Sequence, residues 1–105
     1  MKKEKIPGRS EAGNRRPTEI PINGELDLHF FSPRDVDDIV SNYLAECRAH
    51  GILQVRIVHG KGTGVLRARV HTLLRKLPAV ASFRLAGENA GGWGATIVRL
   101  KPGKP

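Results

Sequence analysis

The side chains best suited to chemistry in this chain are one aspartate and two histidines, Asp27, His29 and His59. Asp27 and His29 are two residues apart, so in an extended segment they share one face, where a carboxylate can fix the tautomer of an imidazole. Such a pair is suited to general acid–base catalysis. A solvated, inert pair is the alternative that these two residues alone leave open.

Residues 59–64 read His-Gly-Lys-Gly-Thr-Gly and give a more specific signal. A glycine-rich turn between a strand and a helix exposes backbone N–H groups beside the positive end of the helix dipole, where phosphate binds well. The segment lacks the Gly-Lys-Ser/Thr triplet of a Walker A loop and has Val65 where a dinucleotide-binding loop needs glycine. It predicts a phosphate contact but no nucleotide-hydrolysing loop. A tight turn that needs positive φ is the alternative.

The charge of the chain favours a polyanionic partner. Its 105 residues carry 18 Lys and Arg against 10 Asp and Glu, a net charge of +8. Residues 1–16 hold six Lys or Arg and two Glu, whereas residues 17–100 hold ten basic and eight acidic side chains. Within that central part, residues 61–76 carry five basic side chains and no acid, so we expect nucleic acid to meet this segment.

Hydrophobic patterning predicts the order strand, helix, strand, helix, strand, strand. Alternation over 26–29 indicates the first strand. Apolar residues at helical spacing follow Ser32, which we interpret as a helix N-cap with Asp35 completing a capping box. The other expected features are a helix end at Gly51, a strand over 54–58, a helix from Leu66 to Leu77, and strands over 80–85 and 93–100. A four-stranded sheet with both helices on one face is the economical arrangement.

This order predicts where the chemical residues lie. A strand-helix-strand unit normally leaves its strands parallel, so His29 and His59 should emerge at the same edge of the sheet. The expected sheet core is Leu26, Leu28, Val55, Ile57, Phe83, Leu85, Val98 and Leu100. Three arginines alternate with core positions and are expected on the uncovered face: Arg56, Arg84 and Arg99. Cys47 is expected in the core, and His50 and His71 on the surface.

Three segments in this order resemble the Smr (small MutS-related) domain family: Leu-Asp-Leu-His at 26–29, the glycine-rich segment 59–64, and Gly-Trp-Gly-Ala-Thr-Ile-Val at 92–98. The resemblance spans about residues 25–101. It implies an α+β fold, a two-layer α/β sandwich of order β-α-β-α-β-β with a four-stranded mixed sheet and two helices on one face. This fold is similar to the C-terminal domain of translation initiation factor three.

With this resemblance the chain divides into a flexible basic N-terminal arm (1–22), an Smr domain (23–101) and a short C-terminal tail (102–105). The length predicts a stand-alone Smr protein, without an attached ATPase or repeat array.

The predicted site follows from the matched segments. The expected catalytic residues are Asp27, His29 and His59, the last as a second proton carrier or a phosphate ligand. The expected phosphate or nucleic-acid contacts are Gly60, Lys61, Gly62, Thr63, Gly64, Arg67, Arg69, Trp93 and Gly94. The Trp93 indole either stacks on an unpaired base or packs over a strand end. Many family members have glycine directly after the first histidine, whereas this chain has Phe30, which would narrow access or provide a stacking surface.

The function predicted is binding of DNA or RNA with endonuclease or nicking activity on phosphodiester bonds. A non-catalytic nucleic-acid or ribosome-binding module is the alternative, and a protein-interaction domain using the sheet edge is a third. A divalent metal, Mg²⁺ or Mn²⁺, is an open alternative to metal-free chemistry; one Asp and two His suit Mn²⁺ or Zn²⁺ better than Mg²⁺. The single cysteine excludes a multi-thiolate zinc site. A cytoplasmic protein without membrane contact is expected; a monomer is compatible with the sequence, and the oligomeric state is open.

Overall fold

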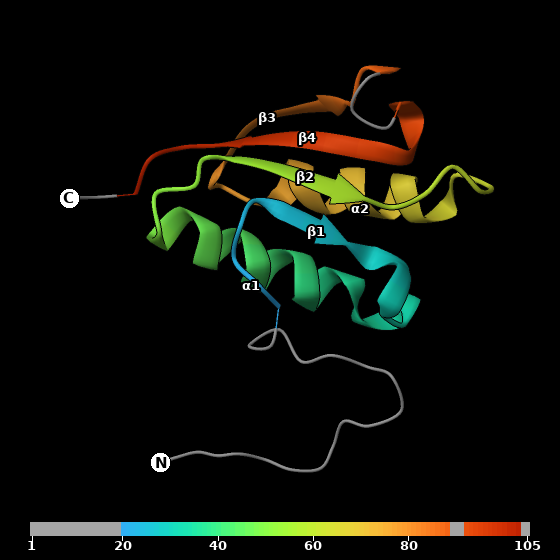
Figure 1. Ribbon diagram of the computed structural model, residues 1–105, viewed down its shortest axis with the longest axis horizontal. Coiled ribbons are helices and arrows are strands. Elements are labelled where there is room, and N and C mark those ends of the chain that lie inside the picture. The colour runs from blue at the N-terminus through green and yellow to red at the C-terminus, as the bar shows by residue number, and fades with distance from the viewer. Residues whose placement is uncertain (1–19, 89–91, 104–105) are drawn as a thin grey trace, which may run out of the picture.

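The computed structural model describes residues 20–88 and 92–103 of the chain (Figure 1). Its strands are β1 (Glu25–Asp27), β2 (Gln54–Val58), β3 (Val80–Leu85) and β4 (Ala95–Leu100), and its helices are α1 (Val36–Ala49) and α2 (Val65–Lys76). Three short 3-10 helices join them: η2 (Leu28–Phe30), η3 (Pro33–Asp35) and η5 (Gly92–Gly94). The predicted order of strands and helices is confirmed.

The four strands form one mixed sheet of order β1-β2-β4-β3. β1 and β2 run parallel, as the strand-helix-strand unit predicted, while β4 is antiparallel to both β2 and β3. The carboxyl ends of β1, β2 and β3 therefore lie at the same edge of the sheet as the start of β4. The segments that directly follow β1 and β2 in sequence, η2 and residues 59–64, therefore lie at this edge.

Both helices cover the same face of the sheet, and the core lies between the two layers (Figure 1). The α1 residues that face the sheet are buried at the predicted helical spacing: Val36, Ile39, Val40, Tyr43, Leu44 and Cys47. α1 ends because Gly51 adopts a φ of +78°, which lets the Ile52 N–H donate to the Cys47 carbonyl at 2.8 Å. In the described part of the chain, no helix covers the opposite face of the sheet, as predicted (Figure 1).

Several local expectations are wrong in detail. Leu28 and His29 belong to the 3-10 turn η2 rather than to the first strand. Ser32 does precede the helical segment, but its side chain makes no cap hydrogen bond and the capping box with Asp35 does not form. Leu85 is 40% exposed because β3 is an edge strand that neither helix fully covers.

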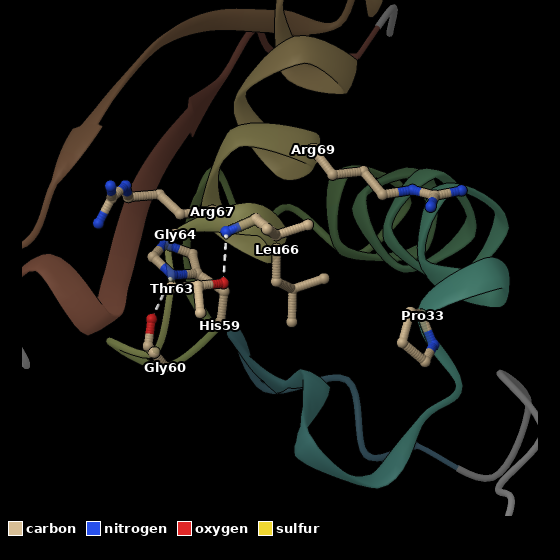
Figure 2. A pocket seen from close by; sticks show the side chains of 10 residues that line it. Pro33, His59, Gly60, Thr63, Gly64, Leu66, Arg67 and Arg69 are labelled. Atoms are coloured by element: carbon tan, nitrogen blue, oxygen red, sulfur yellow. Dashed lines mark hydrogen bonds between the residues drawn. The ribbon is translucent and has the colours of Figure 1, made fainter.

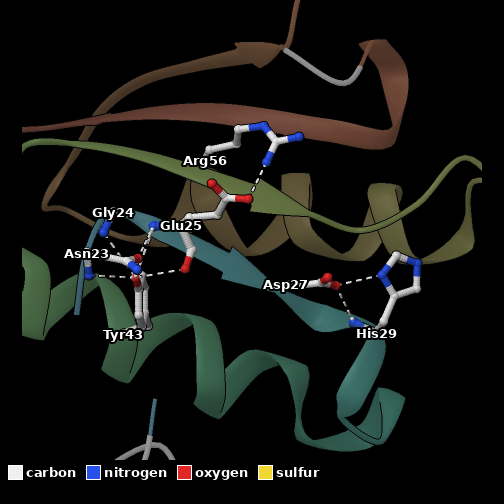
Figure 3. A network of polar contacts seen from close by, with 7 residues as sticks. All are labelled: Asn23, Gly24, Glu25, Asp27, His29, Tyr43 and Arg56. Carbon is white, nitrogen blue, oxygen red and sulfur yellow. Dashed lines mark hydrogen bonds and ion pairs between the residues drawn. The ribbon is translucent and has the colours of Figure 1, made fainter. Parts of the chain in front are cut away.

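The boundary of the predicted arm is also corrected. Ile20 is buried in the core cluster, and the Tyr43 hydroxyl accepts hydrogen bonds from the backbone N–H groups of Gly24 and Glu25, both at 3.1 Å (Figure 3). Residues 20–22 therefore belong to the folded part. The remainder of the predicted arm, residues 1–19, lies outside the described residues. Among the described residues, no helix combines the length and apolarity needed to cross a membrane.

Candidate functional site

Asp27 and His29 form a dyad at the carboxyl end of β1. The Asp27 Oδ1 atom lies 2.6 Å from His29 Nδ1 and accepts the His29 backbone N–H at 2.9 Å (Figure 3). Asp27 is the N-cap of η2, so the carboxylate that starts this turn also holds the imidazole. The side chains of His29 and Asp27 are 60% and 44% exposed, which leaves the dyad open to a macromolecular substrate.

The contact with Asp27 fixes the orientation and the tautomer of the His29 imidazole. A carboxylate oxygen only accepts hydrogen bonds, so the neutral His29 ring carries its proton on Nδ1 and has its lone pair on Nε2. Nε2 faces the glycine-rich loop: a Cβ placed on Gly60 would lie 3.3 Å from it. The prediction that the end of β1 and loop 59–64 meet at one edge is confirmed by this approach.

The glycine-rich loop is held against the start of β4. The Gly94 carbonyl accepts hydrogen bonds from the backbone N–H groups of His59 at 3.0 Å and Gly60 at 2.8 Å. Lys61 lies across the glycines of η5, because a Cβ on Gly94 would be 3.1 Å from Lys61 Cγ. The second and third matched segments of the sequence are thus one unit, in which Gly94 leaves room for the lysine.

His59 departs from the prediction. Only 6% of the residue is exposed, and its ring is turned into the layer between the sheet and α2 instead of emerging at the edge. Its Nδ1 lies 3.1 Å from the Gly60 carbonyl oxygen, and its Nε2 lies 2.8 Å from Thr96 Oγ1. With both ring nitrogens engaged, His59 is placed to position the loop, not to exchange protons with a substrate.

The partner of His59 extends into a buried polar cluster. Thr96 is fully buried, and its Oγ1 also lies 2.7 Å from Nε2 of His71, a residue wrongly expected on the surface. The Gly60 carbonyl requires a proton on His59 Nδ1. Thr96 therefore donates to His59 Nε2 and accepts from the N–H of His71 Nε2.

Burial lowers the pKa of both imidazoles in this cluster, and the nearby Arg67 guanidinium adds to the effect. For His71, the neighbouring His59 and Arg75 act in the same direction. The lowered pKa values favour the neutral form of both rings, in which His59 Nε2 can accept the Thr96 hydroxyl proton.

The sequence carried signals for this cluster that the prediction did not use. Thr96 has the same strand parity as the buried Val98 and Leu100, which places it on the covered face. His71 precedes the buried Leu74 by three residues and so borders the apolar stripe of α2.

The N-terminus of α2 borders a cleft of about 300 Å³ that reaches from the glycine-rich loop to Pro33 (Figure 2). Gly64 is the N-cap of α2 with a φ of +90° and has no side chain to cap the helix, and the first turn holds no acid. The Val65 N–H donates to Thr63 Oγ1 at 3.4 Å. Arg67 folds back over this helix end, with a guanidinium nitrogen 2.8 Å from a Cβ built on Gly64. The exposed first turn and this cation suit a phosphate.

The two arginines predicted to bind nucleic acid point in different directions in Figure 2. Arg67 lies on the sheet side of α2. Arg69 points toward α1, where its Nε lies 3.2 Å from Asp37 Oδ1. Of the remaining predicted contacts, Thr63 lines the cleft and is exposed, whereas the side chain of Trp93 lies outside what the structure describes.

A metal site built from the predicted residues does not form. Asp27 and His29 are adjacent, but His59 uses both ring nitrogens within the protein. Within residues 20–88 and 92–103, no group of three or more His, Cys, Asp or Glu side chains is arranged to hold a metal ion. The residues do not fit a protein-held divalent ion, so we assign no step to one.

The family model of the Smr domain matches residues 26–101 of the sequence. The chain belongs to the Smr domain family. The resemblance predicted from its three segments is therefore confirmed.

Curated relatives of this Smr domain are long proteins named Endonuclease MutS2. That of Carboxydothermus hydrogenoformans is 41% identical over 80 residues, and that of Halothermothrix orenii is 48% identical over 80 residues. In both cases the match covers 76% of this chain and 10% of the relative. The chain thus spans about a tenth of the length of these curated relatives.

Two solved structures confirm the predicted Smr fold. The Smr domain of Thermus thermophilus MutS2 superposes with a TM-score of 0.72 at 39% identity, covering 76% of this chain and all of that domain. YdaL, a stand-alone small MutS-related protein from Escherichia coli, superposes with a TM-score of 0.70 at 26% identity, covering 74% of this chain and 64% of YdaL.

Proposed function

We propose that this Smr domain binds DNA or RNA at the edge formed by η2, loop 59–64 and η5, and that it cleaves a phosphodiester bond there. The observation that carries the proposal is the exposed Asp27–His29 dyad, whose free Nε2 faces Gly60 of the glycine-rich loop. An oriented base and a cradle for the phosphate are the two components that hydrolysis of a phosphodiester needs. The name of the MutS2 relatives supports an endonuclease.

His29 acts as the general base in this proposal. Its Nε2 takes a proton from the attacking water as the new bond to phosphorus forms, and Asp27 stabilises the imidazolium through Nδ1. As the bond to the leaving oxygen breaks, that oxygen takes a proton from solvent, and the His29 imidazolium releases its proton to solvent. Asp27 is a positioning residue because it acts through His29.

The loop and its surroundings stabilise the charge that develops on the phosphate. In this proposal the phosphate beside His29 is held by the backbone of residues 60–64 and the acid-free first turn of α2, and Lys61, which lies over η5, supplies a positive charge. His59 contributes indirectly, since it fixes the Gly60 carbonyl and with it the turn of the loop.

A non-catalytic binding module is the second candidate. It is favoured by the burial of His59, which leaves His29 as the sole histidine of the described residues exposed at this edge. Phe30 is 62% exposed and offers a ring for an unpaired base. In that case the loop would hold phosphate without cleavage.

A cleavage assay separates the two functions. The parent protein, His29→Ala and Asp27→Ala are incubated with single-stranded and structured DNA and RNA, each with and without a chelator. His50→Ala is the matched control, because His50 is an exposed histidine at the far end of α1. We expect cleavage by the parent and by His50→Ala, and loss of cleavage with retained binding in the other two.

Parent-like cleavage by His29→Ala would overturn the catalytic assignment. Binding without cleavage by the parent, weakened by Lys61→Ala, would establish the binding module instead. The cytoplasmic location remains a prediction, and the oligomeric state stays open.

A further inference from the structure

The open face of the sheet carries a second basic surface away from the loop. In the register of the sheet, Arg99 of β4 lies opposite Gln54 of β2 and Ser82 of β3. In the neighbouring row Arg84 and Arg56 flank Ile97. Because residues of one row lie about 5 Å from their neighbours across strands, these side chains share one small area.

A groove of about 170 Å³ lies within this area, lined by Gln54, Ser82, Phe83, Arg84, Ile97 and Arg99. Its polar side chains are two guanidinium groups, an amide and a hydroxyl, and all four can donate hydrogen bonds. No carboxylate lines it. A surface that offers several donors and positive charge without an acid is chemically complementary to a phosphate group.

The charges on the open face are segregated. Arg56 is paired with Glu25, whose Oε2 lies 2.5 Å from a guanidinium nitrogen (Figure 3). Among the described residues, no carboxylate pairs with Arg84 or Arg99; Arg84 makes only a 3.4 Å contact to the Leu85 carbonyl. The β1 side of the face is therefore acidic or neutral, and the β3 and β4 side is basic.

We propose that this groove, the distal phosphate site, binds a backbone phosphate of the same nucleic-acid strand that the Asp27–His29 dyad cleaves. The inference rests on the proposed function for the identity of the strand. Lys61 lies over η5 at the start of β4, at the same edge of the sheet as the dyad, and supplies a further cation there. The strand thus runs along the basic side of the face and avoids Glu25.

The register fixes how far apart the two sites are. Arg99 of β4 lies opposite Gln54 of β2, and Asp27 of β1 lies opposite Val58 of β2. The two sites are therefore separated by the length of β2 from Gln54 to Val58 and by two strand spacings across the sheet. At ~3.3 Å per residue along a strand and ~4.8 Å between strands, the separation is ~16 Å. A strand with nucleotides spaced by ~3.4 Å covers this distance in about five nucleotides. A dinucleotide, which has a single internucleotide phosphate, cannot fill both sites.

Binding of oligonucleotides of graded length tests the site. A fluorescent dinucleotide, the short strand, and a fluorescent single strand of about 12 nucleotides, the long strand, are titrated as DNA and as RNA against His29→Ala protein, so that the readout does not depend on cleavage. Arg84→Ala/Arg99→Ala is introduced into this background. Arg34→Ala/Lys76→Ala removes two exposed cations from the helical layer and is the charge-matched control.

We expect the Arg84/Arg99 change to weaken the long strand about tenfold and to lower its salt slope by about 0.7, the value for one lost phosphate contact on a single strand. The short strand and the control pair should change less than about twofold. Circular dichroism checks that the variants stay folded.

Equal weakening of the long and short strands, or of both double variants, would overturn the distal site, because the effect would then be general charge. The distal site would also be overturned if inorganic phosphate competed with the short strand and not with the long strand. The parent protein could prove to cleave nothing while the Arg84/Arg99 change still weakened the long strand more than the short one. That result would reject the cleavage proposal and retain the distal site.

Discussion

His29 and His59 follow two neighbouring parallel strands, and the Nδ1 atom of each lies within hydrogen-bond distance of an oxygen. Their surroundings differ, because His29 is exposed and His59 is buried. His29 Nδ1 lies on the Asp27 carboxylate, and its Nε2 is open to the loop. His59 Nδ1 lies on the Gly60 carbonyl, and its Nε2 is taken by the fully buried Thr96. The comparison shows that the second ring nitrogen decides the role: an open Nε2 can exchange protons with a substrate, whereas an occupied one holds the loop.

The largest expected effect is on the open side of this comparison. His29→Gln should slow cleavage about 10²- to 10⁴-fold, because it removes the proton acceptor. The free energy of unfolding should change by less than about 0.5 kcal/mol, since the side chain is 60% exposed. Single-turnover rates and urea denaturation measure the two quantities. A loss of stability matching the loss of rate would mean that His29 is structural as well.

Thr96→Val tests the buried side. It keeps the shape of the side chain but leaves Nε2 of both His59 and His71 without their shared partner. We expect about 3 kcal/mol of lost stability in urea denaturation, since each buried unsatisfied group costs about 1 to 3 kcal/mol. Thr96→Ser restores the hydroxyl and is the control. If Thr96→Val and Thr96→Ser were equally stable, the hydroxyl would make no contribution to the stability of the cluster.

The link between the two regions is Gly60, whose φ is +82° and whose Cα faces His29 Nε2. Gly60→Ala should cost about 1 to 3 kcal/mol in backbone strain and reduce cleavage, because the methyl group enters the space beside the imidazole. Gly62→Ala is the control in the same loop, as nothing lies within 4 Å of a Cβ there. Thermal denaturation and cleavage rates should separate the two variants; identical behaviour would contradict the assigned geometry.

The smallest expected effect is on pH dependence. Burial lowers the pKa of His59 and His71 below the ordinary 6.5, so the unfolded chain binds protons first as the pH falls. Stability should therefore be full above pH 6.5 and decline below it toward the lower folded pKa values. Urea denaturation across this range should show a shallower decline for His71→Gln than for the parent. Equal slopes would exclude a contribution from His71.

The sequence was sufficient where structure is local or periodic. The α1 stripe ending at Cys47 follows from helical spacing, and the parallel pairing of β1 and β2 follows from the crossover. The Asp27–His29 pair was predictable because its partners are two residues apart. It forms through a 3-10 turn instead of a strand, since Asp27 caps that turn.

What the sequence could not show is contact between distant elements. The His59–Thr96 and His71–Thr96 bonds join residues 37 and 25 positions apart, and no local spacing encodes them. The burial of His59 depends on the packing of α2 over β4. Its strand-end position alone therefore predicted the wrong orientation.

The central claim is that Asp27 and His29 act as one unit, and a double-mutant cycle tests it most directly. Single-turnover cleavage is measured for the parent, Asp27→Asn, His29→Gln and the double variant, with saturating protein. If Asp27 acts only through His29, the double variant will be no slower than His29→Gln alone. Losses that multiply, or a His29→Gln variant that cleaves at the parent rate, would contradict the account.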